Sequence, residues 1–317
     1  MILVPQSDHS AIQKAVMTTT FTHITYAVGR GRAVITLNRP ERRNAMSLHT
    51  LKELQAALWE ADDDQAVHAV ILRGAGTGFS SGYDLRPDVF ARRDDHAESA
   101  DTQKKYRDGS IYSDVLTIED DSWRLEYSQR LRMTVFDMHK PVVAQVHGHC
   151  LAGGTDLALL CDLVIAAEDA YIGVPPARGL GITPNHMWIY HLGPQWTKRL
   201  LLTGDTLSGK DAAKLGLVLE AVPAAELDAF VDALVDRMCL IHPDMLAGTK
   251  RQVNLALELM GARTLQRLAA EMDARVHASP SSHRFRELMA EHGVAKGVRM
   301  RDEPFGDGRI QLRALAD

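Results

Sequence analysis

Two glycines stand at the start of an apolar, helix-like segment and are followed closely by a carboxylate. Gly153 and Gly154 come after the strand-like run 141–146, and Asp156 lies two residues further on. The first turn of a helix leaves backbone N–H groups without partners, and glycine allows a ligand to approach them closely. A negative oxygen developing there would be stabilised by hydrogen bonds and by the helix dipole. The segment therefore predicts one half of an oxyanion hole.

A second glycine-rich junction lies upstream, in residues 69–85. It begins with a short apolar run rich in β-branched residues, continues through a glycine-rich turn, and places the small residue Ser81 before Gly82. Taken alone, each junction is most often an ordinary turn. Occurring in this order, the two indicate a paired site, with Ser81 N–H as the second backbone donor.

The chain as a whole resembles the enoyl-CoA hydratase/isomerase (crotonase) superfamily. The motifs that carry the resemblance are collinear: 35–46, 79–85, 140–148, 151–167, 200–205 and 212–223. The resemblance implies an α/β fold in which repeated ββα units form a crotonase-like spiral, followed by a C-terminal helical region. It also implies a coenzyme A thioester substrate and an enolate held by two backbone N–H groups.

The same resemblance assigns roles to particular residues. Gly153 and Ser81 supply the oxyanion donors, and Asp156 occupies the position of a glutamate that transfers protons. The aspartate is one methylene shorter than that glutamate, which shortens its reach. The alternative interpretation of Asp156 is a carboxylate that complements the dipole of its helix.

One expected catalytic group is missing. Where hydratases of this family have Pro-Glu, this chain has Pro175 and Pro176, so the second carboxylate is absent. Nearby groups that could exchange a proton instead are Asp84, Tyr83, His147, His149 and His186. We rank His186 first among the histidines, because it replaces a glycine of the loop beside the acyl pocket.

The substrate-binding surface is also assigned by resemblance. The loop 38–46 corresponds to the segment that lines the coenzyme A groove, so Arg42 and Arg43 are candidates for phosphate contacts. The full predicted set is Arg42, Arg43, Ala45, Ser81, Gly82, Tyr83, Asp84 and Gly153. Coenzyme A is part of the substrate, and no separate cofactor and no metal are expected.

The expected reaction is hydration or dehydration of an enoyl-CoA through a stabilised enolate. Double-bond isomerisation, and C–C or thioester hydrolysis on the same scaffold, remain alternatives. A protein that binds acyl-CoA without catalysis is the alternative from another class.

The elements that must position these residues alternate between strand and helix. Strands are expected over 34–37 and 67–72, with a helix over 48–62 between them that begins at the N-cap Ser47. A second such unit comprises a strand over 142–146, a helix over 156–161 and a strand over 163–166, which together predict an α/β fold. Apolar spacing of three and four predicts C-terminal helices over 227–239, 252–260 and 265–276.

The expected organisation has three parts. Residues 1–20 form a flexible tail, and Met17 is a candidate for the native start. Residues 21–223 form the core, with a long insertion at 86–130 that is either a solvated helical segment or a lid. Residues 224–317 form the C-terminal helical region and tail, whose basic stretch from Arg284 is expected to be solvated.

Composition limits the class of partner. The chain has 317 residues with 36 Lys and Arg against 41 Asp and Glu, and a net charge of −5 argues against a nucleic-acid partner. Three cysteines without metal-ligand spacing fit a reducing cytoplasm, and no apolar run suits a membrane span. The family resemblance implies a homotrimer or a hexamer formed from two trimers.

Overall fold

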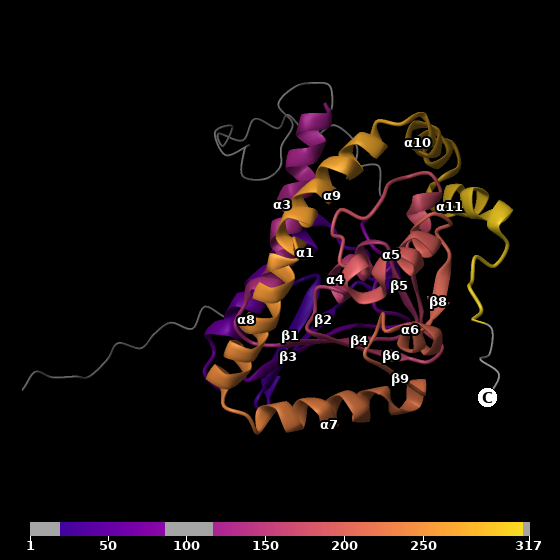
Figure 1. Cartoon of the computed structure of the whole chain (residues 1–317). Coiled ribbons are helices and arrows are strands. Elements are labelled where there is room, and N and C mark those ends of the chain that lie inside the picture. The colour runs from indigo at the N-terminus through magenta and orange to yellow at the C-terminus, as the bar shows by residue number, and fades with distance from the viewer. Residues whose placement is uncertain (1–19, 86–116, 313–317) are drawn as a thin grey trace, which may run out of the picture.

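The computed structural model describes residues 20–85 and 117–312, and a six-stranded sheet forms its centre (Figure 1). Its strands are β1 (Ile24–Gly29), β2 (Arg32–Leu37), β3 (Ala69–Gly74), β4 (Val142–Val146), β6 (Leu163–Ala167) and β9 (Glu220–Val222). They lie in the order β1–β2–β3–β4–β6–β9, with β1 antiparallel to β2 and all other neighbours parallel. Parallel neighbours are joined by crossover connections, and each of these returns the chain to the end of the sheet at which the previous strand began.

A smaller sheet of three strands stands beside the first. It contains β5 (His149–Leu151), β7 (Tyr171–Gly173) and β8 (Thr206–Ser208), with β5 parallel to β7 and β7 antiparallel to β8. Strands β4 and β5 follow one another along the chain but belong to different sheets. The junction between them directs the chain toward the start of the next helix.

Helices connect the strands. Those in the first two thirds of the chain are η1 (Pro40–Arg42), α1 (Leu48–Asp63), α3 (Ile118–Asp137), α4 (Gly153–Ala158), η3 (Pro175–Arg178), α5 (Trp188–Leu201) and α6 (Gly209–Leu215). Helix α1 begins where the sequence predicts, because the Ser47 hydroxyl accepts a hydrogen bond from Thr50 N–H and completes a capping box.

The C-terminal part is helical, as predicted. It contains η4 (Ala224–Glu226), α7 (Leu227–Cys239), α8 (Pro243–Leu259), α9 (Ala262–His277), α10 (Pro280–His292), α11 (Val294–Asp302) and η5 (Glu303–Phe305). Helix α7 packs against β3, β4 and β6, whereas α9 runs alongside α3 (Figure 1). The C-terminal region therefore packs against the rest of the fold on more than one side (Figure 1).

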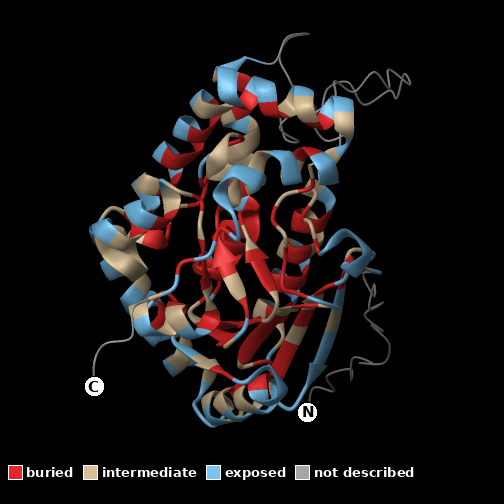
Figure 2. Cartoon of the chain, turned by 90° about the vertical axis from the view of Figure 1, so that its right-hand side faces the viewer, coloured by how far each residue is buried: buried red, intermediate tan, exposed pale blue. Residues whose placement is uncertain are grey.

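The core lies between the main sheet and the helices that cover it. All five residues of β4 are buried, as is typical of a parallel strand covered on both faces. Figure 2 shows the buried strands surrounded by helices whose outer faces are exposed. Within the described residues, no helix is long and apolar enough to cross a membrane, and no cluster of His, Cys, Asp and Glu is suited to hold a metal ion.

Some predicted boundaries differ from the observed ones. The strand expected over 67–72 begins at Ala69, because Val67 N–H closes a turn onto Asp64 O at 3.0 Å. The helix expected over 156–161 is the short α4, which already starts at Gly153. The basic stretch from residue 284 is not wholly solvated, since the side chain of Arg301 is 7 % exposed and pairs with Asp302.

The structure describes only part of the insertion predicted at 86–130. Residues 86–116 lie outside the described residues, so a lid there stays a prediction. Residues 118–130 belong to α3, which is capped by Thr117 and packs against α1 and α9. This part of the insertion is a helix of the fold.

Candidate active site

The two glycine-rich junctions lie side by side. Ser80 N–H donates to His149 O at 3.0 Å, and Leu151 N–H donates to Ser80 O at 2.9 Å. A Cβ atom on Gly82 would lie 3.0 Å from Gly153 N, and the φ of +106° at Gly82 is in the region that favours glycine. The structure thus brings the loop after β3 against the start of α4, as the sequence analysis expected.

The two predicted backbone donors differ in availability. Ser81 N–H donates to Arg43 O at 2.9 Å, so its hydrogen is already used within the protein. Tyr83 N–H and Gly153 N–H donate to no acceptor within residues 20–85 and 117–312. This corrects the expectation for Ser81: within the described residues, Tyr83, two residues later, has an available N–H on this loop, and Gly153 has one at the start of α4.

Asp156 is buried in the first turn of α4 and is only 1 % exposed. Its Oδ2 accepts a hydrogen bond from Tyr83 Oη at 2.5 Å, whereas its Oδ1 is buried and has no hydrogen-bond partner among the described residues. Burial raises the pKa of Asp156 to about 7, against the opposing effects of the Arg132 charge and the Tyr83 hydrogen bond. A carboxyl group with a pKa near neutrality can both accept and return a proton.

The alternative role of Asp156, as a carboxylate serving its own helix, finds less support. The N-cap of α4 is Ala152, with no side-chain cap. The carboxylate of Asp156 bonds the Tyr83 hydroxyl, which comes from another loop. The side chain is directed to tertiary contacts rather than to the helix backbone.

The Tyr83 ring packs directly on Gly153. A Cβ atom at residue 153 would lie 2.6 Å from the ring, so the tyrosine can occupy this place only because residue 153 is glycine. The pKa of Tyr83 is raised well above its ordinary value, chiefly by burial. The phenol therefore stays protonated and acts as a hydrogen-bond donor.

Arg132 is a site residue that the sequence analysis missed. It lies on α3 with 0 % exposure, and the carbon of its guanidinium lies 5.0 Å from the centroid of the Tyr83 ring. Its Nε donates to Asn185 Oδ1 at 2.6 Å, while Nη1 and Nη2 have no partner within the described residues. The sequence around Arg132 is rich in charged residues and predicts a solvated side chain, whereas in the fold this arginine is covered by segments distant along the chain, among them Tyr83 and Asn185.

Asp273 is a second missed residue, on the neighbouring helix α9. Its Oδ1 accepts a hydrogen bond from Ile182 N–H at 2.8 Å. Burial raises the pKa of Asp273 to about 6, and its negative charge in turn raises the pKa of Asp156. The candidate site therefore contains two buried carboxyl groups, one from the core and one from the C-terminal region.

His186 lies beside an apolar cavity. Its backbone N–H donates to Gln266 Oε1 at 2.8 Å, and its Nδ1 is buried without a partner. The cavity has a volume of about 250 Å³ and is lined by His186 together with apolar residues that include Ile182, Leu265 and Met272. Burial lowers the pKa of His186, so its neutral form is favoured.

The other predicted proton carriers are engaged in structural contacts. His147 Nε2 pairs with Gly76 O at 2.9 Å, and His149 Nε2 pairs with Arg43 O at 3.2 Å. Asp84 is buried and forms an ion pair with Arg39 Nη1 at 3.1 Å. These contacts fix the turns around the site.

The predicted coenzyme A residues line the entrance to the same loop. Arg42 and Arg43 are exposed at the end of η1, and Ala45 is half-buried. Met46 N–H donates to Gly82 O at 2.8 Å, which attaches this loop to the glycine junction. Both arginine side chains are exposed, and a role in binding coenzyme A phosphates stays a prediction.

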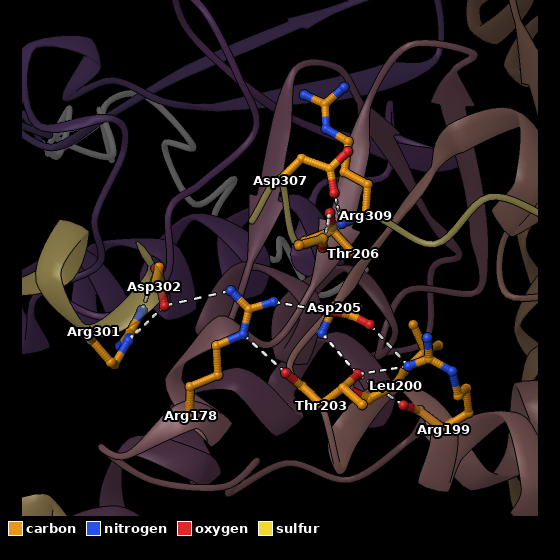
Figure 3. A network of polar contacts seen from close by, with 11 residues as sticks. Arg178, Arg199, Leu200, Thr203, Asp205, Thr206, Arg301, Asp302, Asp307 and Arg309 are labelled. Carbon is orange, nitrogen blue, oxygen red and sulfur yellow. Dashed lines mark hydrogen bonds and ion pairs between the residues drawn. The ribbon is translucent and has the colours of Figure 1, made fainter. Parts of the chain in front are cut away.

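The segment that should carry the second carboxylate is held in place by Arg178 (Figure 3). Its Nε donates to Thr203 O at 2.9 Å, and its Nη2 contacts Asp205 Oδ1 at 3.0 Å. Its Nη1 lies 3.5 Å from Asp302 Oδ1, at the end of α11. The two prolines of η3 are thus anchored on the C-terminal region and offer no acidic group.

Comparison with known proteins agrees with this geometry. The sequence model of the enoyl-CoA hydratase/isomerase family matches residues 32–291. The chain belongs to this family. As an enoyl-CoA hydratase/isomerase family member, it is similar to the protein EchA13 of Mycobacterium tuberculosis, whose name places it among the enoyl-CoA hydratases, with 35% identity over 248 residues and 76% of each chain covered.

Other members of the enoyl-CoA hydratase/isomerase family are similar as well. The hydroxycinnamoyl-CoA hydratase-lyase of Pseudomonas fluorescens is 30% identical over 247 residues, which cover 77% of this chain and 82% of the relative. A solved enoyl-CoA hydratase of Mycobacterium smegmatis superimposes with a TM-score of 0.81 at 37% identity, covering 91% of this chain and 96% of that one. The predicted crotonase-like fold with a C-terminal helical region is confirmed.

Proposed function

We propose that the protein hydrates an α,β-unsaturated acyl-CoA, or dehydrates the corresponding 3-hydroxyacyl-CoA. The observation that carries this proposal is the buried Asp156 carboxyl group, hydrogen-bonded to Tyr83 and three residues after the free donor Gly153. Membership in the enoyl-CoA hydratase/isomerase family supports a coenzyme A thioester as substrate.

In this proposal the thioester oxygen accepts hydrogen bonds from Tyr83 N–H and Gly153 N–H. Addition of water to the β-carbon moves negative charge onto that oxygen, and the two fixed donors stabilise the resulting enolate more than the neutral thioester. The proton lost by water passes to Asp156, and the α-carbon takes a proton from the same group. Water's oxygen thus ends on the β-carbon and one hydrogen on the α-carbon.

One proton carrier suffices if it can act in both directions. The segment 175–178 supplies no carboxylate, and the pKa of Asp156 near 7 suits a group that first accepts and then donates. The same observation favours double-bond isomerisation as a second candidate, because moving a proton between the α- and γ-carbons also needs a single acid/base group.

The test is turnover of the Asp156→Asn variant. Hydration of crotonyl-CoA and isomerisation of 3-hexenoyl-CoA are measured separately, together with affinity for a saturated acyl-CoA. We expect the active reaction to slow by about a hundredfold or more with affinity changed only a few fold. Asp244→Asn, at an exposed position on α8, is the control. Unchanged turnover in Asp156→Asn would remove this residue from the mechanism, and binding without any turnover in the wild type would favour a non-catalytic acyl-CoA binder.

We further propose a cytoplasmic homotrimer or hexamer. Exposed apolar residues on and just beyond α8, such as Val253, Leu259 and Met260, support burial of this surface between subunits. All three cysteines are free thiols, which supports a reducing compartment. Light scattering after size-exclusion chromatography measures the assembly, and a monomer would contradict it.

A further inference from the structure

The guanidinium of Arg132 is buried with two of its nitrogens unpaired. The side chain has 0 % exposure, and only Nε has a partner, Asn185 Oδ1 at 2.6 Å. Nη1 and Nη2 meet no acceptor in the described part of the chain. The charge of Arg132 interacts with the carboxyl groups of Asp156 and Asp273 and lowers the pKa of each, but neither accepts a hydrogen bond from it. Buried N–H groups without acceptors are unfavourable, so a further group that completes these bonds is expected.

The unpaired nitrogens lie at the reacting end of the site. The guanidinium carbon lies 5.0 Å from the centroid of the Tyr83 ring. The hydroxyl of that ring bonds Asp156 Oδ2, and Asp156 Oδ1 is also buried without a partner. Unpaired donors of Arg132 and an unpaired acceptor of Asp156 therefore flank Tyr83, beside the donors assigned to the thioester.

We infer that the acyl group of the natural substrate carries a carboxylate, which Arg132 binds through Nη1 and Nη2. The substrate class is then an enoyl-CoA with a second, free carboxylate on its acyl chain. This inference rests on the proposed function, because it assumes that the acyl chain lies beside Asp156.

The chemistry of arginine suits this assignment. The planar guanidinium presents parallel N–H donors that match the two oxygens of a carboxylate, and such charge-assisted pairs are the strong ones in proteins. A neutral acyl chain would leave both nitrogens unpaired, so the site would discriminate against it. Burial also holds the pKa of Asp156 near 7, which limits repulsion between this residue and a bound carboxylate at neutral pH.

The test compares pairs of saturated acyl-CoAs that have the same number of carbons and differ in a terminal carboxylate. Malonyl-CoA is paired with propionyl-CoA, succinyl-CoA with butyryl-CoA, and glutaryl-CoA with pentanoyl-CoA, which varies the distance from thioester to carboxylate. Calorimetry gives the dissociation constants. In the wild type we expect at least one carboxylated ligand to bind about tenfold or more tightly than its partner, as a hydrogen-bonded charge pair implies.

Two variants assign the preference to Arg132. Arg132→Met is expected to abolish it, whereas Arg130→Met, on the same helix with an exposed side chain, retains it. Arg132→Gln serves where the methionine variant does not fold, and circular dichroism checks both. Wild-type protein that prefers no carboxylated ligand, or a preference that survives loss of the guanidinium, would overturn the inference. In that case water completes the hydrogen bonds of Arg132.

Turnover separates this inference from the proposed function. Glutaconyl-CoA and crotonyl-CoA are the unsaturated substrates with and without a carboxylate. Hydration of crotonyl-CoA together with indifferent binding of the ligand pairs would reject the carboxylate and leave the hydratase. A carboxylate preference in binding, with no turnover of either enoyl-CoA, would reject the hydratase and leave the anion site.

Discussion

Tyr83 Oη donates a hydrogen bond to Asp156 Oδ2 at 2.5 Å, across 73 positions of sequence. The bond joins the loop after β3 to helix α4, the same two segments that present the free N–H groups of Tyr83 and Gly153. In the proposed mechanism one residue, Tyr83, therefore contributes its backbone N–H to the thioester oxygen and its hydroxyl to the Asp156 carboxyl group. Replacing the Tyr83 side chain by phenylalanine removes the hydroxyl and leaves the backbone N–H in place.

Tyr83→Phe should move the pH dependence of catalysis upward. The phenol hydrogen bond lowers the pKa of Asp156, so its loss raises that pKa further. A hydrogen bond to a charged group is worth about 1.5 to 3 kcal/mol, which corresponds to a displacement of about one pH unit or more. The profile of kcat/KM between pH 5 and 9 measures it. Tyr26→Phe is the matched control, because the buried Tyr26 hydroxyl has no hydrogen-bond partner in the part of the chain that the structure describes.

Asp156→Asn should be more stable than the wild type at pH 8. The folded-state pKa of Asp156, about 7, lies above its ordinary value of 3.8, so the folded protein holds the proton more tightly than the unfolded chain. Wild-type stability attributable to this group is fully present below pH 4 and is lost as the pH rises to 7. Urea unfolding should show a gain on the order of 1 to 4 kcal/mol at pH 8 that shrinks toward pH 5. An equal or opposite effect at the two pH values would contradict this assignment.

Gly153→Ala should damage catalysis more than folding. The new Cβ would lie 2.6 Å from the Tyr83 ring and displace both the ring and the adjacent N–H groups. Loss of one oxyanion donor costs about a hundredfold or more in kcat. Gly248→Ala on α8 is the control, since a Cβ there meets nothing within 4 Å. Equal kinetics in the two variants would remove Gly153 from the oxyanion site.

Pro176→Glu should raise the rate of crotonyl-CoA hydration only slightly above that of the wild type. Pro176 belongs to η3, and its carbonyl accepts hydrogen bonds from Gly179, Leu180 and Gly181. Arg178 anchors the same segment on Thr203 and Asp205, so its backbone is fixed by its own contacts. A carboxylate misplaced by about 1 Å loses most of its catalytic benefit. A large gain in crotonyl-CoA hydration would show that the segment already has the geometry of a two-carboxylate site.

Local patterns predicted much of the fold. The spacing of apolar residues and the Ser47 cap located α1, and the C-terminal helix α7 begins and ends at the predicted residues 227 and 239. These features depend on neighbours along the chain, which the sequence displays directly. The two glycines were also expected at the start of this helix, although the predicted range 156–161 begins three residues after α4 does.

The donor on the other loop could not be chosen from the sequence. Ser81 is the small residue beside the glycine, but its N–H is used by Arg43 O, which comes from a distant loop. Arg43 adopts a positive φ of 52°. This conformation is uncommon for residues other than glycine, so the sequence does not predict it at an arginine. Arg132 and Asp273 were missed for a related reason: they are buried against residues distant in sequence, such as Asn185 and Ile182, whereas charged residues in helices usually face water.

The dependence of the site on α9 has a consequence for how the protein is made. Both oxyanion junctions leave the ribosome well before α9, whereas Gln266 and Asp273 of that helix hold the backbone at His186 and Ile182. A nascent chain therefore contains both glycine-rich junctions before it contains α9, whose residues Leu265, Ala269 and Met272 line the cavity beside His186. A chain that ends before α9 would lack these residues and with them one side of that cavity.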